Sequence, residues 1–370
     1  MRFGLLCDDL SASSIVEALA AEVGGHRLVR AARINQNSDS LLHGLGGTTL
    51  ISHWEELLNT HEVDAVLLGG NDPAILQWAK QLATAGIPLL LVPHAAQGST
   101  FAYELSLIHD DNHVLLYPWF WHRYDAGVNR FREGLQNGEL GRVQFLQLER
   151  VVAHSSSGTS IPLPDVDAEL LSDVDLLRWL MGDYNQVTSL RTAVTPAGVM
   201  MQSVVMSGRS LPEANWSIKS NVSLSQWRLT AQGERGTASL NRDPSQTNWI
   251  CEFNGQVTAG VTRDTVSRQL AAFAAAVPDK KSATVRQPIQ RSNCEWSELV
   301  KCFETIDATQ RSVARRRTIE LHFEPMSERA IFKTQMTAIG CGLLVATFFL
   351  SLGYLGIASL IPLPPPVLSE

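Results

Sequence analysis

Residues 1–120 repeatedly alternate short apolar segments with amphipathic helical segments, which leaves few possible folds. The apolar segments are RFGLLC, HRLVRAAR, VDAVLLGG, IPLLLVP and HVLLYPW. Segments that are apolar on both faces and separated by helices are typical of a parallel sheet covered by helices on both sides. We therefore predict a Rossmann-like, doubly wound α/β domain of the dinucleotide-binding type for residues 1–120.

The pattern changes near Val128. A helical segment, VNRFREGLQNGEL, is followed by longer segments in which apolar and polar residues alternate, such as RVQFLQLERVVA and WSIKSNVSLSQWRLTAQG. A period of two residues predicts strands with one covered face, as in an antiparallel sheet. Residues 121–323 are therefore predicted to form an α+β domain with a mostly antiparallel sheet.

The stretch from 338 to 361, AIGCGLLVATFFLSLGYLGIASLI, contains no charged residue. At about 1.5 Å per residue it is long enough to cross a hydrocarbon core of about 30 Å. We predict a transmembrane helix there, with residues 324–337 as a linker and 362–370 as a tail. The alternative is a buried core helix, although such helices rarely lack a polar face. Basic residues precede the stretch, which favours a single-pass anchor with the globular part in the cytoplasm.

Composition excludes several functions. The net charge of −7 and the lack of a basic stripe argue against nucleic-acid binding. The five cysteines form no CxxC pair, which favours reduced thiols and predicts no metal site. The first ten residues, MRFGLLCDDL, do not fit a signal peptide, so export is not expected.

Four segments, in this order, carry a resemblance to a known family: EVDAVLLGGNDPAILQWAKQLATAGIPLLLV, HRYDAGVNRFREGLQNGELGRV, SDVDLLRWLMGD and RGTASL. Together they make residues 1–323 resemble the Gfo/Idh/MocA family of NAD(P)-dependent oxidoreductases. The resemblance implies hydride transfer between a nicotinamide cofactor and a small substrate.

The cofactor motif of that family is degenerate in this chain. Its Gly-x-Gly-x-x-Gly/Ala positions fall on Cys7, Asp9 and Ala12, of which only the last fits. A carboxylate about 5 Å from a phosphate would cost on the order of 3 kcal/mol at an effective dielectric near 20. The resemblance places the cofactor site at Asp8, Asp9, Ser11, Arg33, Gly70 and Asn71.

Each of these polar residues also has an ordinary structural interpretation. Asp8, Asp9 and Ser11 are residue types that cap helices. Arg33 suits the 2′-phosphate of NADP, or is a solvated arginine at a strand end. Binding of NADP or NAD therefore stays open, as does the absence of any cofactor.

The catalytic positions of the family are also altered. Its lysine segment aligns with Val92, Pro93 and His94, and its histidine with Ser172. His94 and Asp175 remain as weak candidates for catalytic residues; the alternatives are a satisfied loop histidine and an acidic residue that favours the helix dipole. Trp121, Arg123 and Ser172 are the candidates for the substrate pocket.

These losses favour a membrane-anchored homologue without the usual hydride transfer, acting as a scaffold, sensor or regulatory partner. It would pair with itself or with a family enzyme through the exposed face of the second-domain sheet. One alternative is an active oxidoreductase for a sugar or polyol-like substrate with a rebuilt cofactor site. The other is a small-molecule binding module without redox chemistry.

Overall fold

The computed structural model of the protein comprises two compact units, residues 1–321 and 322–370. It describes residues 1–43, 45–153, 160–192, 198–221, 225–242, 248–261, 264–278, 294–323 and 345–351. In the second unit, residues 345–351 are helical. No helix among the residues described is both long and apolar enough to cross a bilayer. Most of the segment 338–361, predicted to be transmembrane, lies outside the described residues.

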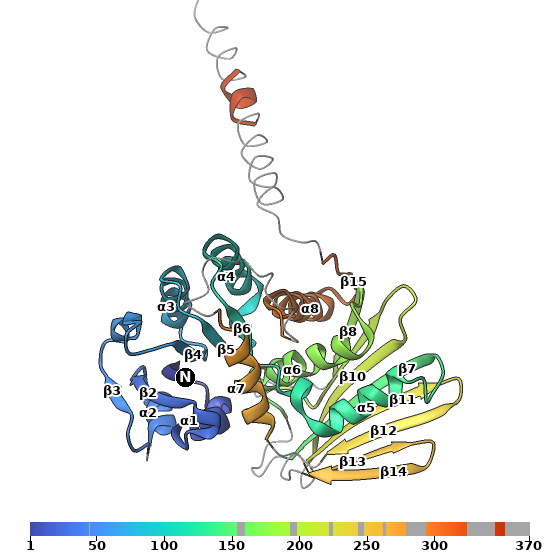
Figure 1. Cartoon of the computed structure of the whole chain (residues 1–370). Coiled ribbons are helices and arrows are strands. Elements are labelled where there is room, and N and C mark those ends of the chain that lie inside the picture. Colours follow the sequence, from blue (N-terminus) through green and yellow to red (C-terminus); the bar gives the residue numbers. More distant parts are fainter. Residues whose placement is uncertain are drawn as a thin grey trace, which may run out of the picture. The chain divides into compact units, whose positions relative to one another are not determined.

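The first part of the larger unit contains a six-stranded parallel sheet (Figure 1). Its strands are β1 Arg2–Cys7, β2 Arg27–Ala32, β3 Thr49–Ile51, β4 Ala65–Gly69, β5 Leu89–Val92 and β6 Leu116–Pro118. Its helices are α1 Ser13–Ala20, α2 Gln36–Leu42, α3 Pro73–Thr84 and α4 Gly98–Asn112, with short 3₁₀ helices η1 Leu10–Ala12, η2 Val23–Gly25 and η3 Trp54–Leu58. The predicted parallel sheet is confirmed, and between β3 and β4 the chain forms only the short 3₁₀ helix η3.

The order of these strands locates a binding region. The sheet runs β3-β2-β1-β4-β5-β6, so the chain moves outward from β1 in one direction and from β4 in the other. β1 and β4 are paired from Phe3 with Ala65 to Cys7 with Gly69. Ligands of open parallel sheets bind beyond the carboxyl ends of the strands at such a reversal of strand order. The loops after Cys7 and Gly69 therefore form the candidate binding region.

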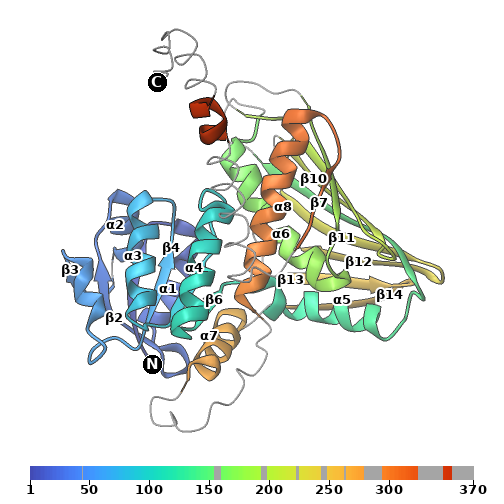
Figure 2. The same ribbon diagram turned by 90° about the horizontal axis from the view of Figure 1, so that it is seen from above.

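A nine-stranded mixed sheet follows (Figure 2). Its order is β14-β13-β12-β11-β7-β10-β9-β8-β15. The strands are β7 Val143–Ala153, β8 Gln186–Thr192, β9 Met201–Ser207, β10 Glu213–Asn221, β11 Gln226–Gly233, β12 Gly236–Arg242, β13 Asn248–Phe253, β14 Gln256–Val261 and β15 Ile319–Glu320. Because β7 and β10 pair in parallel and the other neighbours are antiparallel, the predicted mostly antiparallel sheet is confirmed.

One face of this sheet is covered by helices. These are α5 Ala126–Gln136, α6 Leu163–Met181 and α8 Trp296–Arg315, while α7 Thr265–Ala276 lies toward the first sheet (Figure 2). The short 3₁₀ helix η4 Trp121–Tyr124 packs against α7. Alternate residues such as Leu146, Leu148 and Trp216 are fully buried. Burial of each such side chain contributes roughly 2 kcal/mol. The opposite face carries mostly small polar side chains, as the period-two pattern predicts.

Helix α8 connects the two sheet layers. It packs against α4 on one side and against α6 and β8 on the other. The Trp296 indole donates a hydrogen bond of 3.0 Å to the carbonyl oxygen of Ala102 in α4. A helix near the end of the chain therefore fixes elements that are about two hundred residues earlier, which no local pattern in the sequence could indicate.

Candidate functional site

Asp8, the first residue after β1, lies at the centre of the reversal of strand order. Its carboxylate accepts a hydrogen bond of 2.7 Å from the Asn35 side-chain amide, which follows β2. It also accepts one of 3.2 Å from the backbone N–H of Asn71, which follows β4. Asp8 is only 4% exposed. One carboxylate thus ties together the loops that follow three neighbouring strands.

The loop after β4 is shaped to receive this carboxylate. Gly70 has a φ of +119°, and a Cβ there would stand 1.5 Å from Asp8 Oδ1. Any other residue would collide with the carboxylate and be strained as well. The Gln97 amide group donates to the Gly70 carbonyl oxygen at 3.0 Å. The sequence placed Asp8, Gly70 and Asn71 at one site, and the structure brings these three together.

The neighbouring carboxylate caps a helix. Asp9 accepts a hydrogen bond of 2.8 Å from the backbone N–H of Ser11 and so caps η1, which leads directly into α1. This is the structural alternative to ligand binding that the sequence left open for Asp9 and Ser11. Because the Asp9 carboxylate already pairs with an N–H group and with the positive end of the helix dipole, this helix start binds a phosphate less well.

Arg33 immediately follows β2 and lies on the surface. Its Nε donates to Asp39 Oδ1 at 2.8 Å, and its side chain is 58% exposed. An exposed pair of this kind contributes little to stability, so the guanidinium can exchange partners. Arg33 remains a residue that could hold a 2′-phosphate.

His94 follows β5 and interacts locally. Its Nδ1 accepts from the backbone N–H of Ala96 at 3.2 Å, and its own N–H donates to Gln97 Oε1 at 3.2 Å. These contacts match the interpretation of His94 as a satisfied loop residue. They do not join it to Asp175, the other candidate for proton transfer.

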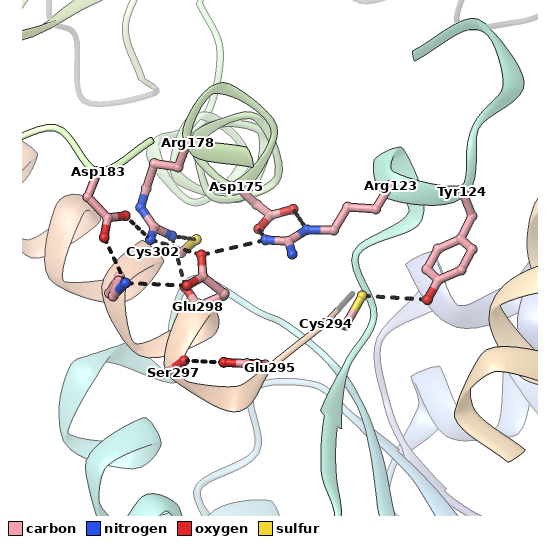
Figure 3. Close-up of polar contacts among 11 residues, drawn as sticks. Arg123, Tyr124, Asp175, Arg178, Asp183, Cys294, Glu295, Ser297, Glu298 and Cys302 are labelled. Carbon is pink, nitrogen blue, oxygen red and sulfur yellow. Dashed lines mark hydrogen bonds and ion pairs between the residues drawn. The ribbon is translucent and has the colours of Figure 1, made fainter. Parts of the chain in front are cut away.

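Asp175 instead forms a buried ion pair (Figure 3). Arg123 Nε donates to its Oδ2 at 3.0 Å, and Nη2 donates to its Oδ1 at 2.5 Å. Arg123 comes from η4 and Asp175 from the middle of α6, and both are buried. Burial alone would lower the pKa of Arg123, but the charge and hydrogen bonds of Asp175 outweigh it and raise that pKa. This geometry suits a link between η4 and α6.

The pair belongs to a larger polar cluster (Figure 3). Arg178 Nη2 contacts Asp183 at 2.5 Å and Glu298 at 3.0 Å. Lys301 contacts Asp183 at 2.7 Å. Glu298 also lies 3.7 Å from Arg123. Sequence reasoning missed these residues because Glu298 is separated from Arg123 and Arg178 by more than a hundred positions.

A second buried cluster surrounds Asp173 of α6, on the face of the second sheet that the helices cover. Arg150 of β7 contacts its carboxylate through Nε at 2.5 Å and Nη2 at 2.8 Å. The Trp216 indole donates to it at 2.7 Å, and His122 Nε2 lies 3.5 Å away. Burial would raise the pKa of Asp173, but Arg150 and His122 lower it overall.

The remaining substrate-pocket candidates are not brought together. The Arg242 guanidinium lies 4.4 Å from the centroid of the Trp121 ring, and the His122 ring centroid is 3.6 Å away. Ser172 is half-buried on α6. Because the Trp121 ring already contacts Arg242 and His122, less of its surface is left for a substrate. Among the residues that the structure describes, no cluster of His, Cys, Asp or Glu could hold a metal.

A parallel sheet with a strand-order reversal at β1 and β4, joined to a mixed sheet backed by helices, is the fold of two-domain oxidoreductases of the dinucleotide-binding type. The chain is similar to a putative myo-inositol dehydrogenase from Sinorhizobium meliloti, with 17% identity, a TM-score of 0.67, and coverage of 87% of this chain and 100% of that one. It is also similar to a myo-inositol dehydrogenase from Corynebacterium glutamicum, with 15% identity, a TM-score of 0.66, and coverage of 88% and 99%.

A third similar structure is an oxidoreductase from Agrobacterium radiobacter in complex with NAD⁺, L-tartaric acid and magnesium. It has 12% identity, a TM-score of 0.69, and coverage of 86% of this chain and 98% of that one. No family model and no curated protein matches the sequence. At these identities the likeness shows the fold that this chain shares with these oxidoreductases.

Proposed function

We propose that this protein has the fold of an NAD(P)-dependent oxidoreductase but does not carry out hydride transfer, and acts as a scaffold, sensor or regulatory partner. The observation that carries the proposal is the position of Asp8. Its carboxylate occupies the reversal point between β1 and β4 and is held there by Asn35 and the Asn71 N–H. The chain thus supplies its own anion at the reversal of strand order, the region in which a dinucleotide binds such a sheet.

Other polar groups around this site have partners within the chain. The Ser11 N–H is bonded to Asp9, the His94 N–H to Gln97, and the Ala96 N–H to His94. A pyrophosphate at the start of η1 and α1 would have to displace Asp9 from the Ser11 N–H and approach the carboxylates of Asp8 and Asp9. At about 5 Å each carboxylate would cost on the order of 3 kcal/mol at an effective dielectric near 20, roughly a hundredfold in affinity.

The second candidate function is an active NAD(P)-dependent oxidoreductase with a sugar or polyol-like substrate. The structural comparisons favour it, because similar structures include inositol dehydrogenases and an oxidoreductase in complex with NAD⁺. Within this chain, exposed Arg33 at the end of β2 supports it, since an arginine there suits NADP. The non-redox small-molecule module has no further observation in its favour.

A nucleotide titration separates the two candidates. The full chain is titrated with NADH and NADPH, followed by nicotinamide fluorescence and thermal shift, beside the variants Asp8→Asn and Arg33→Ala. We expect no binding to the wild type up to millimolar concentration. Asp8→Asn removes the charge at constant shape and should improve any binding by up to about a hundredfold. Micromolar NADPH binding by the wild type, lost in Arg33→Ala, would refute the proposal in favour of the oxidoreductase.

We also propose that residues 338–361 anchor the protein in a membrane, with the remainder in the cytoplasm. The support is the charge-free stretch and the basic residues that precede it. Membrane fractions washed with alkaline carbonate should retain the full chain and release a chain that ends at residue 337. Complete release of the full chain would contradict the anchor.

A further inference from the structure

The second sheet ends on one side in β14, whose outer edge is not paired with any other part of the chain that the structure describes. β14 pairs with β13 and with no other described strand. Its sequence, QVTAGV, contains no charge and no proline. Val257 is 63% exposed and Val261 is 42% exposed. Natural sheets usually block such an edge with lysine, proline, a bulge or a covering element, because it can pair with another strand.

The hairpin geometry indicates which backbone groups face outward. β13 and β14 are joined by Asn254 and Gly255, which both have positive φ, and the flanking residues Phe253 and Gln256 are opposite each other. In such a two-residue hairpin the flanking pair exchanges hydrogen bonds, and the bonded pairs then alternate along the ladder. The N–H and C=O groups of Gln256, Thr258 and Gly260 therefore face β13. Those of Val257, Ala259 and Val261 face away from the sheet.

The side chains of these three residues share the uncovered face of the sheet. Ile250 on β13 is opposite Ala259 and is 49% exposed. Val257, Ala259, Val261 and Ile250 thus form an apolar corner on a face that elsewhere carries mainly serine, threonine, asparagine and glutamine. The nearest charge on that face is Glu252, one strand inward and opposite Val257.

We propose that β14 pairs antiparallel with β14 of a second copy of this chain. A twofold axis beside Ala259 places the two Ala259 residues opposite each other. Val257 of each copy then lies opposite Val261 of the other copy. The three outward residues of each copy then exchange up to about six hydrogen bonds, with no side chain of like charge opposed. The two apolar corners become continuous. A contact that uses the same patch on both subunits closes as a dimer.

Cysteine cross-linking tests this register. In a full chain carrying Cys341→Ser, Ala259→Cys places two thiols across the axis, with Cα atoms about 5.5 Å apart, a spacing that a disulfide accepts. The other four cysteines are buried. Arg228→Cys, exposed at the centre of the uncovered face on β11, is the matched control. We expect Ala259→Cys to form a covalent dimer on mild oxidation at least tenfold faster than Arg228→Cys.

A second pair of variants tests the edge itself. Val257→Lys in the Ala259→Cys chain introduces a charge at the edge and should slow cross-linking at least tenfold, whereas Val257→Thr should not. Because Val257 is exposed, both variants should keep the thermal unfolding temperature of their parent. Faster cross-linking of Arg228→Cys would overturn the proposal in favour of a face-to-face dimer. Equal, slow cross-linking at both positions would overturn it in favour of a free edge or another protein's strand.

Discussion

Arg123 and Asp175 form a bidentate, buried ion pair between η4, which follows the first sheet, and α6, which covers the second. The adjacent residue His122 lies 3.5 Å from Asp173, two positions earlier on α6. Positions two apart on a helix point in nearly opposite directions. Consecutive residues of η4 are therefore held on two sides of α6, which fixes how the chain passes from one sheet to the other.

Breaking this ion pair should be costly. Asp175→Ala leaves the buried Arg123 without its main counter-charge, and we expect the free energy of unfolding to fall by about 3–5 kcal/mol. The double variant Arg123→Met, Asp175→Leu removes both charges and should recover most of that loss. Urea denaturation of the full chain measures both effects. A loss of less than about 1 kcal/mol in Asp175→Ala would show that the pair is dispensable.

Asp8 and Gly70 should be energetically coupled. Asp8→Ala leaves two donors without their acceptor, at a cost of about 1–3 kcal/mol. Gly70→Ala brings a Cβ to 1.5 Å from the Asp8 carboxylate and should cost at least as much. In the double variant the clash is absent, so the combined loss should be smaller than the sum by about 1–3 kcal/mol. Strict additivity in thermal unfolding would contradict the contact.

Acid should destabilise the protein through Asp173. Its pKa is lowered by Arg150 and His122 despite burial, so the folded state binds fewer protons than the unfolded state. The stabilisation is present above the unfolded pKa of about 3.9 and is lost as the pH falls toward the folded value. Asp173→Asn should therefore lower the free energy of unfolding by about 3 kcal/mol at pH 7. The difference from wild type should shrink below pH 4 in urea denaturation; a constant difference would contradict this.

Glu304 on α8 should change the stability with pH in the opposite sense to Asp173. Burial and the neighbouring charge of Asp307 raise the pKa of Glu304 to about 7. The folded state then binds more protons than the unfolded state, so this contribution is full below about pH 4.5 and is lost as the pH rises through 7. Glu304→Gln should raise the free energy of unfolding by about 1 kcal/mol at pH 8, after allowance for partial exposure, and by nothing at pH 4. Glu133→Gln, exposed on α5, is the control and should change neither value.

Much of the fold was predictable because it depends on local patterns. Residues such as Leu67, Leu68, Leu90 and Leu91 lie in short strands buried on both faces, and that burial is visible in the sequence as continuous apolar runs. Alternation in β7 and β10 likewise indicated a sheet with one covered face. The parallel pairing of β7 with β10 was not predictable, since a period of two is the same in either direction.

The candidate site was predictable only in part. Asp8, Gly70 and Asn71 could be placed together because the carboxyl ends of neighbouring parallel strands share one edge. Asn35 follows β2 in the same way, and this signal could have included it.

The sequence by itself determined the two sheet types, the degenerate glycine positions and the acidic residues that replace them, because each depends on residues within a few positions of one another. Only the tertiary structure decided what those acidic residues contact. The Asp8 carboxylate contacts Asn35 and Asn71, and the Asp175 carboxylate contacts Arg123. Strand order and helix packing bring together these groups, which are separated by 27 to 63 positions in the sequence. From the sequence alone, a carboxylate can be assigned as a ligand-binding group, a helix cap or half of an ion pair. Its partners in the folded protein determine which of these roles it has.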